Sequence, residues 1–389
     1  TFFIWAFEST FQYLYMISWR NIAQSVQNEI RLDTYEYTQR LDLQWFESQR
    51  IGNITTIIND DVNQLERFLN NGVNDLIQII VSTLAIGAVF FYISPLIAMV
   101  ALLPVPIILI IVLLFQKKLG PKYLDVRNAA GKLSNTIYNN LLGIVTIKSF
   151  SSEEVEVRRV SKLSNLYQQK NKAAILLSSA FVPVVRMGVL SGFIATTVIG
   201  SFLALNGKIE IGSFSVLMFL TQRFLWPFTR IGEIVDLFER SMASTKRILD
   251  LLEERFNIKD KEKSISKLVN NDIVFSNVMF EYDRGYPILN DFSLTIKRGQ
   301  FLGIAGQTGC GKSTLIKLLL RFYEPTSGKI MISNYNLNDF KLKSLRTSIG
   351  FVNQEIFLFD GTIKENISYP DSNYTEDEIV NAAKKSQAH

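Results

Sequence analysis

The residues best suited to chemistry in this 389-residue chain form one glycine-rich stretch. It runs from Gly306 to Thr314, reads GQTGCGKST and satisfies the pattern G-x-x-x-x-G-K-[ST]. Glycines allow a backbone to wrap closely around phosphate oxygens and to point its N–H groups at them. The lysine of such a loop reaches the β- and γ-phosphates, and the next hydroxyl binds Mg²⁺. The stretch therefore predicts a nucleotide-binding loop.

The sequence on either side of the loop provides the context that nucleotide binding requires. Residues 300–305 are mainly apolar and predict a short buried strand, and residues 313–322 predict a helix. Such a helix points its positive dipole end at a bound phosphate. The alternative interpretation, a turn with ordinary glycines, does not explain why the pattern lies between a strand and a helix. The predicted ATP-binding residues of the loop are Gly306, Gln307, Thr308, Gly309, Cys310, Gly311, Lys312, Ser313 and Thr314.

Three side chains of this loop have different predicted roles. Lys312 contacts the phosphates and is the one residue with a predicted catalytic part, whereas Ser313 is a predicted Mg²⁺ ligand. Cys310 is the only cysteine, so the chain has no internal disulfide. No covalent role is expected for its thiol, because phosphoryl transfer relies on positioning and charge. His389, the only histidine, is likewise not expected to be catalytic.

The C-terminal part of the chain has the patterns of a soluble α/β domain. Residues 272–282 and 292–297 alternate apolar and polar side chains, as half-buried strands do. Residues 349–352 predict a further strand. The sequence Thr-Glu-Asp-Glu at 375–378 is a capping box and predicts the start of a final helix.

The first 240 residues, in contrast, contain long apolar runs. Residues 76–93 and 96–115 are each long enough to cross about 30 Å of hydrocarbon at about 1.5 Å per residue. The break between them, Ser94-Pro95, carries no Lys or Arg, so the positive-inside rule places it outside the cell. The segment 116–172 is rich in Lys and Arg and is expected in the cytoplasm, as helices that extend beyond the membrane. The predicted spans are residues 1–20, 74–93, 96–116, 173–205 and 211–238.

These patterns divide the chain into two domains. We expect a membrane domain over residues 1–254, a linker over 255–270 with a charged part at 262–267, and a nucleotide-binding domain over 271–389. The net charge of +5, from 41 Lys and Arg against 36 Asp and Glu, comes without long basic runs. Nucleic acid is therefore not an expected partner, and the lipid bilayer is.

Four further segments, in their order and spacing, resemble ATP-binding cassette (ABC) exporters of the multidrug and lipid-flippase type. They are Val278–Tyr282, Pro325–Ile330, Phe351–Glu355 and Leu358–Ile367, and the resemblance extends from Asn21 to the end of the chain. It implies a type I exporter fold, in which an all-α membrane bundle with long intracellular helices is fused to an α/β P-loop NTPase domain. The family's signature segment, acidic strand and hydrolytic glutamate do not occur in this sequence, so we expect a fragment with a partial ATPase domain. Five spans with the nucleotide domain inside would leave Thr1 outside, so we also expect that the first transmembrane helix is lacking.

The resemblance also implies roles for individual residues. Tyr282 matches the aromatic residue that stacks on adenine, and Gln354 matches the glutamine that binds Mg²⁺ and senses the membrane helices. The alternatives are a half-buried strand tyrosine and an ordinary surface glutamine. Asn353 stands where the family commonly has proline. Residues 45–52 and 140–150 resemble the two coupling helices that dock on nucleotide domains, with ordinary cytoplasmic helix as the alternative.

The resemblance predicts an ATPase-coupled translocase that exports or flips a hydrophobic or amphipathic substrate such as a lipid, drug or peptide. The full-length protein is expected to be a half-transporter that pairs with a second one, as a homodimer or heterodimer, using ATP and Mg²⁺. The expected location is a prokaryotic plasma membrane with the nucleotide domain in the cytoplasm. The alternatives are a nucleotide-gated regulatory protein and, with less support, an import system. The fragment alone is not expected to hydrolyse ATP at a useful rate.

Charged residues within the predicted spans are candidates for the transport pathway, because an isolated charge in the membrane usually faces a cavity or a partner. Arg186 is the first of them, although its span exceeds the membrane thickness and the residue would also fit an inner vestibule. The same interpretation applies to four residues of the last span, namely Arg223, Arg230, Glu233 and Asp236.

Overall fold

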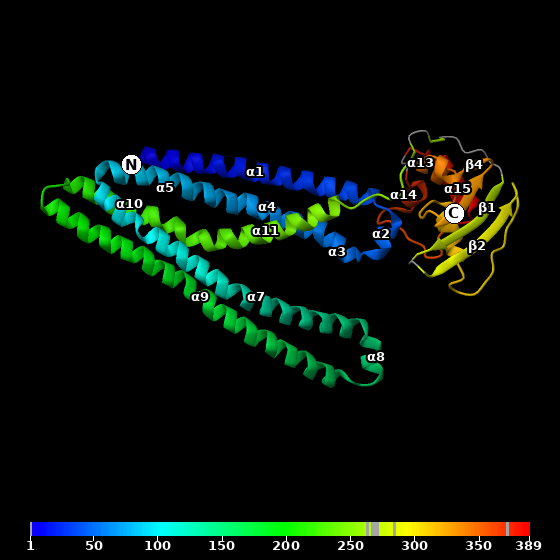
Figure 1. The fold of residues 1–389 in the computed structure, drawn as a ribbon, viewed down its shortest axis with the longest axis horizontal. Coiled ribbons are helices and arrows are strands. Elements are labelled where there is room, and N and C mark those ends of the chain that lie inside the picture. Colours follow the sequence, from blue (N-terminus) through cyan, green and yellow to red (C-terminus); the bar gives the residue numbers. More distant parts are fainter. Residues whose placement is uncertain (1, 262–263, 266–271, 283–284, 371–372) are drawn as a thin grey trace. The chain divides into compact units, whose positions relative to one another are not determined.

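The chain forms two compact units. The computed structural model describes residues 2–261, 264–265, 272–282, 285–370 and 373–389. The first unit comprises Thr1–Leu41 and Trp45–Arg255, and the second comprises Asp42–Gln44 and Phe256–His389. The first unit is mostly helical, and the second, smaller unit contains the β-sheet (Figure 1).

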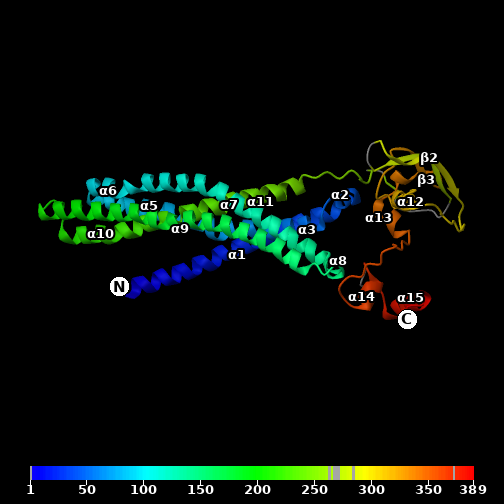
Figure 2. The ribbon, with the colours of Figure 1, turned by 90° about the horizontal axis from the view of Figure 1, so that it is seen from below.

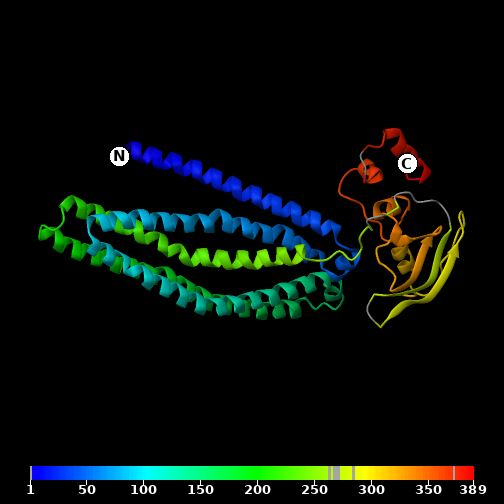
Figure 3. The same ribbon diagram turned by 45° about the horizontal axis from the view of Figure 1, so that its top comes forward.

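In its described residues the first unit is helical, and long helices are joined by short ones. The helices are α1 (Phe2–Arg40), α2 (Leu43–Ser48), α3 (Ile51–Thr56), η1 (Ile57–Asp61), α4 (Val62–Arg67), η2 (Phe68–Val73), α5 (Asn74–Ile93), α6 (Pro95–Leu102), α7 (Pro104–Leu142), α8 (Ile144–Ser149), α9 (Glu153–Leu205), α10 (Ile211–Leu225), η3 (Trp226–Arg230) and α11 (Ile231–Leu252). The short helix α2 begins at residues of the second unit. The chain reverses direction between α7 and α9, and these two long helices pack along each other (Figures 1 and 3). The predicted helical bundle is confirmed.

Three helical stretches of the described chain are long and apolar enough to cross a membrane. They are Ile51–Ile93, Pro95–Leu142 and Glu153–Leu205, and they contain the predicted spans 74–93, 96–116 and 173–205. The other two predicted spans, residues 1–20 and 211–238, coincide with the first half of α1 and with α10, η3 and the start of α11. Whether these two cross the membrane stays a prediction.

Glycines on α9 bring neighbouring helices of this unit into close contact. A Cβ atom at Gly192 would lie 2.5 Å from Cγ of Pro104, and one at Gly200 would lie 2.6 Å from the ring of Phe214. Any larger residue would push the helices apart, because such distances are shorter than van der Waals contact. Around these contacts lie two apolar clusters that include Ile108 and Leu217, both fully buried.

Helices α7 and α9 continue beyond the predicted spans and are joined by a short turn. The turn contains α8, which is visible at the end of the pair α7 and α9 in Figure 2. It is closed by a hydrogen bond of 3.0 Å from Asn140 Nδ2 to Glu156 Oε2 and by an ion pair of 2.8 Å between Lys148 and Glu153. Glu153 also lies in the first turn of α9, where a negative charge complements the helix dipole. The expectation of long helices beyond the membrane agrees with this arrangement.

The second unit contains a four-stranded antiparallel sheet. Its strands are β1 (Ile273–Glu281), β2 (Pro287–Ile296), β3 (Ser327–Ile332) and β4 (Tyr335–Asn336), in the order β2-β1-β3-β4. Its helices are α12 (Lys312–Leu319), η4 (Leu337–Asp339), α13 (Leu342–Thr347), α14 (Ile363–Ser368) and α15 (Glu376–Lys385). The predicted strands at 272–282 and 292–297 and the predicted helix at 313–322 correspond to β1, β2 and α12.

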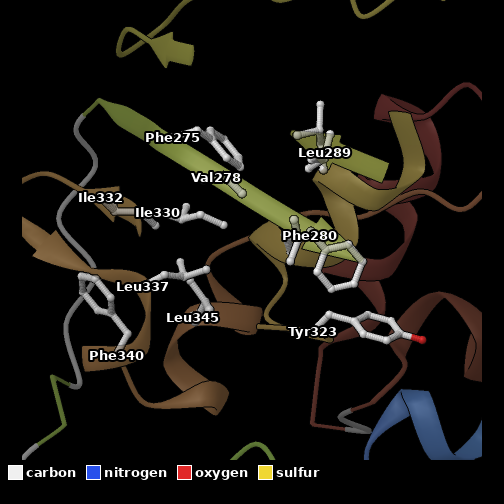
Figure 4. Packing of buried hydrophobic residues seen from close by; sticks show 12 residues of the cluster. Phe275, Val278, Phe280, Leu289, Tyr323, Ile330, Ile332, Leu337, Phe340 and Leu345 are labelled. Carbon is white, nitrogen blue, oxygen red and sulfur yellow. The ribbon is translucent and has the colours of Figure 1, made fainter. Parts of the chain in front are cut away.

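One hydrophobic core holds the sheet and α12 together. Phe275, Val278 and Phe280 of β1 enter it (Figure 4), and a register shift between Phe275 and Val278 brings two residues three positions apart into the same core. From α12, Leu318 is fully buried in the same core. Burial of the apolar face of α12 against the sheet fixes the helix whose first residues belong to the phosphate loop.

Two predicted strands are wrong. Residues 300–305 and 349–352 are irregular and do not pair with the four-stranded sheet. Phe301 is 100% exposed and Val352 is 91% exposed. A buried strand requires hydrogen-bonded neighbours as well as an apolar sequence, and the described residues provide no such neighbours for these two segments.

The residues that follow α11 fold onto the second unit. Of the predicted linker 255–270, residues from Phe256 onwards belong to this unit. Ile265 forms a parallel bridge with Phe340, in which its N–H donates to the carbonyl of Asp339 at 2.7 Å. Residues 262–263 and 266–271, which include most of the predicted charged part and the predicted start of the nucleotide-binding domain, lie outside the described residues.

Candidate nucleotide-binding site

The phosphate loop turns into α12 through two glycines with left-handed backbone conformation. Gly309 has φ +86° and Gly311 has φ +95°, and α12 begins at the next residue, Lys312. Only glycine adopts this conformation without a steric cost. A Cβ at Gly311 would also lie 3.1 Å from Cγ2 of Ile288. The backbone therefore reverses tightly and exposes the first N–H groups of α12, which have no partner within the helix.

The side chain of Lys312 forms hydrogen bonds to the backbone of the phosphate loop. Its Nζ donates to the carbonyl of Gly306 at 2.8 Å and to that of Gln307 at 2.7 Å, and lies 3.8 Å from Sγ of Cys310. A Cβ at Gly306 would lie 2.6 Å from the same sulfur. The ammonium thus lies within the curve of the loop, where a phosphate that binds the backbone N–H groups would meet it.

The two hydroxyls that follow Lys312 have different surroundings. Ser313 is exposed, as a metal ligand in contact with a soluble nucleotide should be. Thr314 is buried, and its Oγ1 lies 3.2 Å from the hydroxyl oxygen of Tyr282. Thr314 therefore holds the helix against β1, whereas Ser313 is accessible.

Tyr282 lies beside α12, at the end of β1. Its half-buried ring makes edge contacts with Phe280 and Tyr323, at centroid distances of 4.8 Å and 5.0 Å. Nζ of Lys317 lies 5.5 Å from the centre of the Tyr282 ring, within the range of a cation–π interaction. The structure thus brings Tyr282 to the phosphate loop through Thr314. Its stacking on adenine stays a prediction.

Gln354 is placed differently. It lies in an exposed irregular segment, and its backbone N–H donates to the side-chain oxygen of Asn353 at 2.9 Å. Over the described part of the chain, no hydrogen bond joins Gln354 to the phosphate loop. The predicted Mg²⁺ ligand pair of Ser313 and Gln354 is therefore not assembled here, and the role of Gln354 stays a prediction.

A structured turn follows this segment, within the stretch Leu358–Ile367 that carries part of the family resemblance. Asn366 of α14 accepts a hydrogen bond from the N–H of Phe359 at 2.8 Å and donates to the carbonyls of Phe359 and Thr362. Thr362 and Glu365 form a capping box, and hydrogen bonds from Thr362 lower the pKa of the Glu365 carboxyl. The signal was present in the sequence, because Thr362 and Glu365 have the same spacing as the capping box at 375–378.

Arg321, just beyond α12, is the residue least predictable from sequence. Its φ of +51° lies in the left-handed region, which costs a residue with a side chain about 1 kcal/mol or more relative to glycine. Its side chain is only 3% exposed. Its partners come from several parts of the second unit, so no local pattern identifies it.

The charged candidates of the membrane unit differ in whether they are paired. Arg223 forms an ion pair of 2.8 Å with Glu8, and Arg230 lies 3.5 Å from Asp75. Asp236 pairs with Arg240 on its own helix at 3.0 Å. Arg186 and Glu233 are exposed and have no ion pair among the described residues.

Comparison with known families agrees with this two-part organisation. A family model described as the ABC transporter transmembrane region matches residues 1–228, and a second model, described as ABC transporter, matches residues 289–389. The chain belongs to the ABC transporter family. It combines the membrane region and the ATP-binding region of an ABC exporter half-transporter, as the sequence resemblance implied.

Proteins similar to this ABC transporter chain include several from bacteria. It is 30% identical over 363 residues to the uncharacterized ABC transporter ATP-binding protein YknU of Bacillus subtilis, covering 92% of this chain and 62% of the relative. It is 30% identical over 361 residues to the fatty acid ABC transporter ATP-binding/permease protein of Mycobacterium tuberculosis, covering 93% and 57%. A probable multidrug resistance ABC transporter ATP-binding/permease protein of B. subtilis, YheI, is 30% identical over 343 residues, covering 87% and 58%.

The chain spans about three fifths of the length of these curated relatives, with 62% of the first. A solved structure of a bacterial Atm1-family ABC exporter with ATP bound superposes with a TM-score of 0.81 at 20% identity. That match covers 97% of this chain and 67% of the other. The predicted fold, an exporter-type membrane bundle fused to an ABC ATP-binding region, is confirmed.

Proposed function

We propose that the full-length protein is an ATP-driven exporter that moves a hydrophobic or amphipathic substrate across a bacterial plasma membrane. The observation that carries the proposal is the phosphate loop, folded as a closed cradle around Lys312 in the same chain as the membrane helices. Relatives described as fatty acid and multidrug transporters support a substrate of low polarity. The nucleotide domain would then lie in the cytoplasm, where ATP is available.

The loop fits a nucleotide triphosphate in shape and in charge. A Cβ at Gly306 would lie 2.6 Å from Sγ of Cys310 and one at Gly311 would lie 3.1 Å from Cγ2 of Ile288, so the loop takes this tight shape only with glycine at both positions. Lys312 holds its ammonium in the curve with donors turned to carbonyls, which phosphate oxygens would replace as acceptors. Ser313 offers an accessible hydroxyl to Mg²⁺, and Gln354 would need to move to join it. Bound ATP supplies the free energy of the cycle.

The other steps of the proposed cycle are conformational changes of the protein. Two half-transporters would associate, as a homodimer or a heterodimer, and each loop would be covered by the partner. Closure of the two domains would move the long helices between two arrangements. The turns at residues 45–52 and 140–150 would connect the two movements, and Tyr282 would orient the nucleotide base through its ring.

Transport by the reconstituted full-length protein tests the proposal. Inside-out vesicles with wild-type protein should accumulate a fluorescent amphipath in the presence of ATP and Mg²⁺, and Lys312→Met should abolish accumulation. Lys343→Met is the matched control, because Lys343 is an exposed lysine of α13 and lies outside the loop sequence. Nucleotide binding by the wild type without accumulation or ATP turnover would favour a nucleotide-gated regulator and refute the exporter.

A further inference from the structure

A second polar network lies at the end of α12 opposite the phosphate loop. Arg321 follows the helix in a left-handed conformation, with φ +51°. The N–H of Arg321 donates to the carbonyl of Leu318 at 3.0 Å, and the N–H of Phe322 donates to that of Lys317 at 2.9 Å. This hydrogen-bond pattern ends many helices, usually with glycine at the left-handed position. An arginine is the less favourable choice for the backbone, so its side chain should provide contacts that glycine cannot.

The guanidinium of Arg321 joins three parts of the second unit. Nη2 donates to the carbonyl of Lys259 at 2.9 Å, and Nη1 donates to the carbonyl of Phe340 at 3.3 Å. Nε and Nη2 both donate to Oε1 of Glu324, at 3.2 Å and 3.0 Å. Asp260 adds a carboxylate at 3.9 Å. A planar fork with fixed donors holds such partners in one geometry, which a lysine cannot do.

Residues 256–261, here called the post-α11 segment, are fixed to the domain by further contacts. Oδ1 of Asp260 accepts from the N–H of Leu342 at 2.8 Å, and Nζ of Lys261 donates to Asp339 at 2.7 Å. Arg321 connects this segment to the end of α12, because its Nη2 donates to the carbonyl of Lys259. The backbone of Arg321 is itself held, because Nη2 of Arg346 donates to its carbonyl at 3.0 Å.

We propose that Arg321 is a positioning residue that couples the phosphate loop to the post-α11 segment. Helix α12 has eight residues, so the loop and Arg321 are the two ends of one rigid element about 12 Å long. The chain then needs only residues 253–255 to reach α11, which ends at Leu252. A movement of the loop on nucleotide binding is thereby passed to the last long helix of the membrane unit. This connection is separate from the two turns at residues 45–52 and 140–150.

Hydrogen exchange in the full-length protein tests the nucleotide part of the inference. Saturation with a non-hydrolysable ATP analogue and Mg²⁺ should slow amide exchange in the post-α11 segment by about fivefold or more in the wild type. In Arg321→Gln this slowing should be lost, while the Kd for the analogue stays within about threefold of wild type. Arg321→Lys should resemble Arg321→Gln if the fork geometry, and not the charge, makes the connection. Arg298→Gln, at an exposed arginine of the same unit, is the matched control.

A variant on the other side of the contact separates positioning from simple destabilisation. Asp260→Asn should also lose the nucleotide-dependent slowing, and the double variant with Arg321→Gln should be no worse than either single one, because both changes interrupt one connection. Wild-type slowing in Arg321→Gln would overturn the inference. A parallel loss of analogue affinity and melting temperature in Arg321→Gln would also overturn it, by assigning the residue to folding alone.

The transport part of the inference rests on the proposed function. In the reconstituted dimer, Arg321→Gln should reduce substrate stimulation of ATP hydrolysis by about fivefold or more, with basal hydrolysis near the wild-type rate. Unchanged stimulation in this variant would refute the transport part. If the wild type neither transports nor hydrolyses ATP, the proposed function fails, and the exchange experiment still decides the nucleotide part.

Discussion

The substitution Gly311→Ala examines whether the backbone of the phosphate loop determines nucleotide affinity. Gly311 has φ +95° and directly precedes α12. An alanine in the left-handed region costs about 1–2 kcal/mol, and its Cβ would in addition lie 3.1 Å from Ile288. If nucleotide binding requires this backbone conformation, a free-energy cost of about 1–2 kcal/mol for adopting it lowers the apparent nucleotide affinity by about 5–30-fold.

Alanine substitutions at two other glycines serve as controls, because they distinguish the effect of backbone strain on stability from its effect on nucleotide binding. Gly299 has φ +76°, but a Cβ added there would have no neighbouring atom within 4 Å, and Gly350 has neither a left-handed φ nor a close neighbour. Gly299→Ala should lower the melting temperature of the nucleotide domain without changing nucleotide affinity, and Gly350→Ala should change neither. Titration with a fluorescent ATP analogue gives the three affinities. Wild-type affinity in Gly311→Ala would refute the argument from backbone geometry.

Three further predictions follow from single contacts. Hydrogen bonds from Thr375 lower the pKa of Glu378, so the cap of α15 is complete above the ordinary carboxyl range and is lost as pH falls through the lowered value. Protection of the α15 amides should therefore decrease in acid. Asp61, 3% exposed, accepts from Ser244 at 2.8 Å and from Nε of Arg247 at 2.7 Å, so Asp61→Ala should cost about 1–3 kcal/mol and lower the melting temperature. Sγ of Cys310 lies 3.8 Å from Nζ of Lys312 in the phosphate loop, so a bulky alkyl group on this sulfur should block nucleotide binding.

Each of these predictions has a control. Glu378→Gln keeps an acceptor that does not ionise, so its α15 protection should show no acid step. Asp250→Asn changes an exposed carboxylate on α11 and should leave stability unchanged. Cys310→Ala should retain binding after treatment with the alkylator, and unchanged nucleotide affinity in the alkylated wild type would contradict the third prediction.

Features that depend on neighbours in sequence were predictable. The loop at 306–314 and the helix after it follow from glycines and a lysine within nine positions, and the cap at Thr375 follows from a carboxyl three residues later. The long helices on either side of the predicted spans also follow from local periodicity. The family resemblance extended these local results to the whole chain.

Features that depend on distant residues were not predictable. The apolar segments 300–305 and 349–352 have strand composition, but pairing is decided by segments elsewhere, and neither joins the sheet. The ring of Tyr282 meets Tyr323, which is 41 positions away, and no pattern in the sequence connects them. The same holds for Arg321 and the carbonyl of Lys259.

The most direct test of the account is ATP turnover by the full-length dimer in lipid vesicles. With Mg²⁺, the wild type should hydrolyse ATP, and an amphipathic substrate should raise the rate, whereas Lys312→Met should hydrolyse none with or without the substrate. ATP binding by the wild type with no turnover under any of these conditions would contradict the central claim that this chain belongs to a pump.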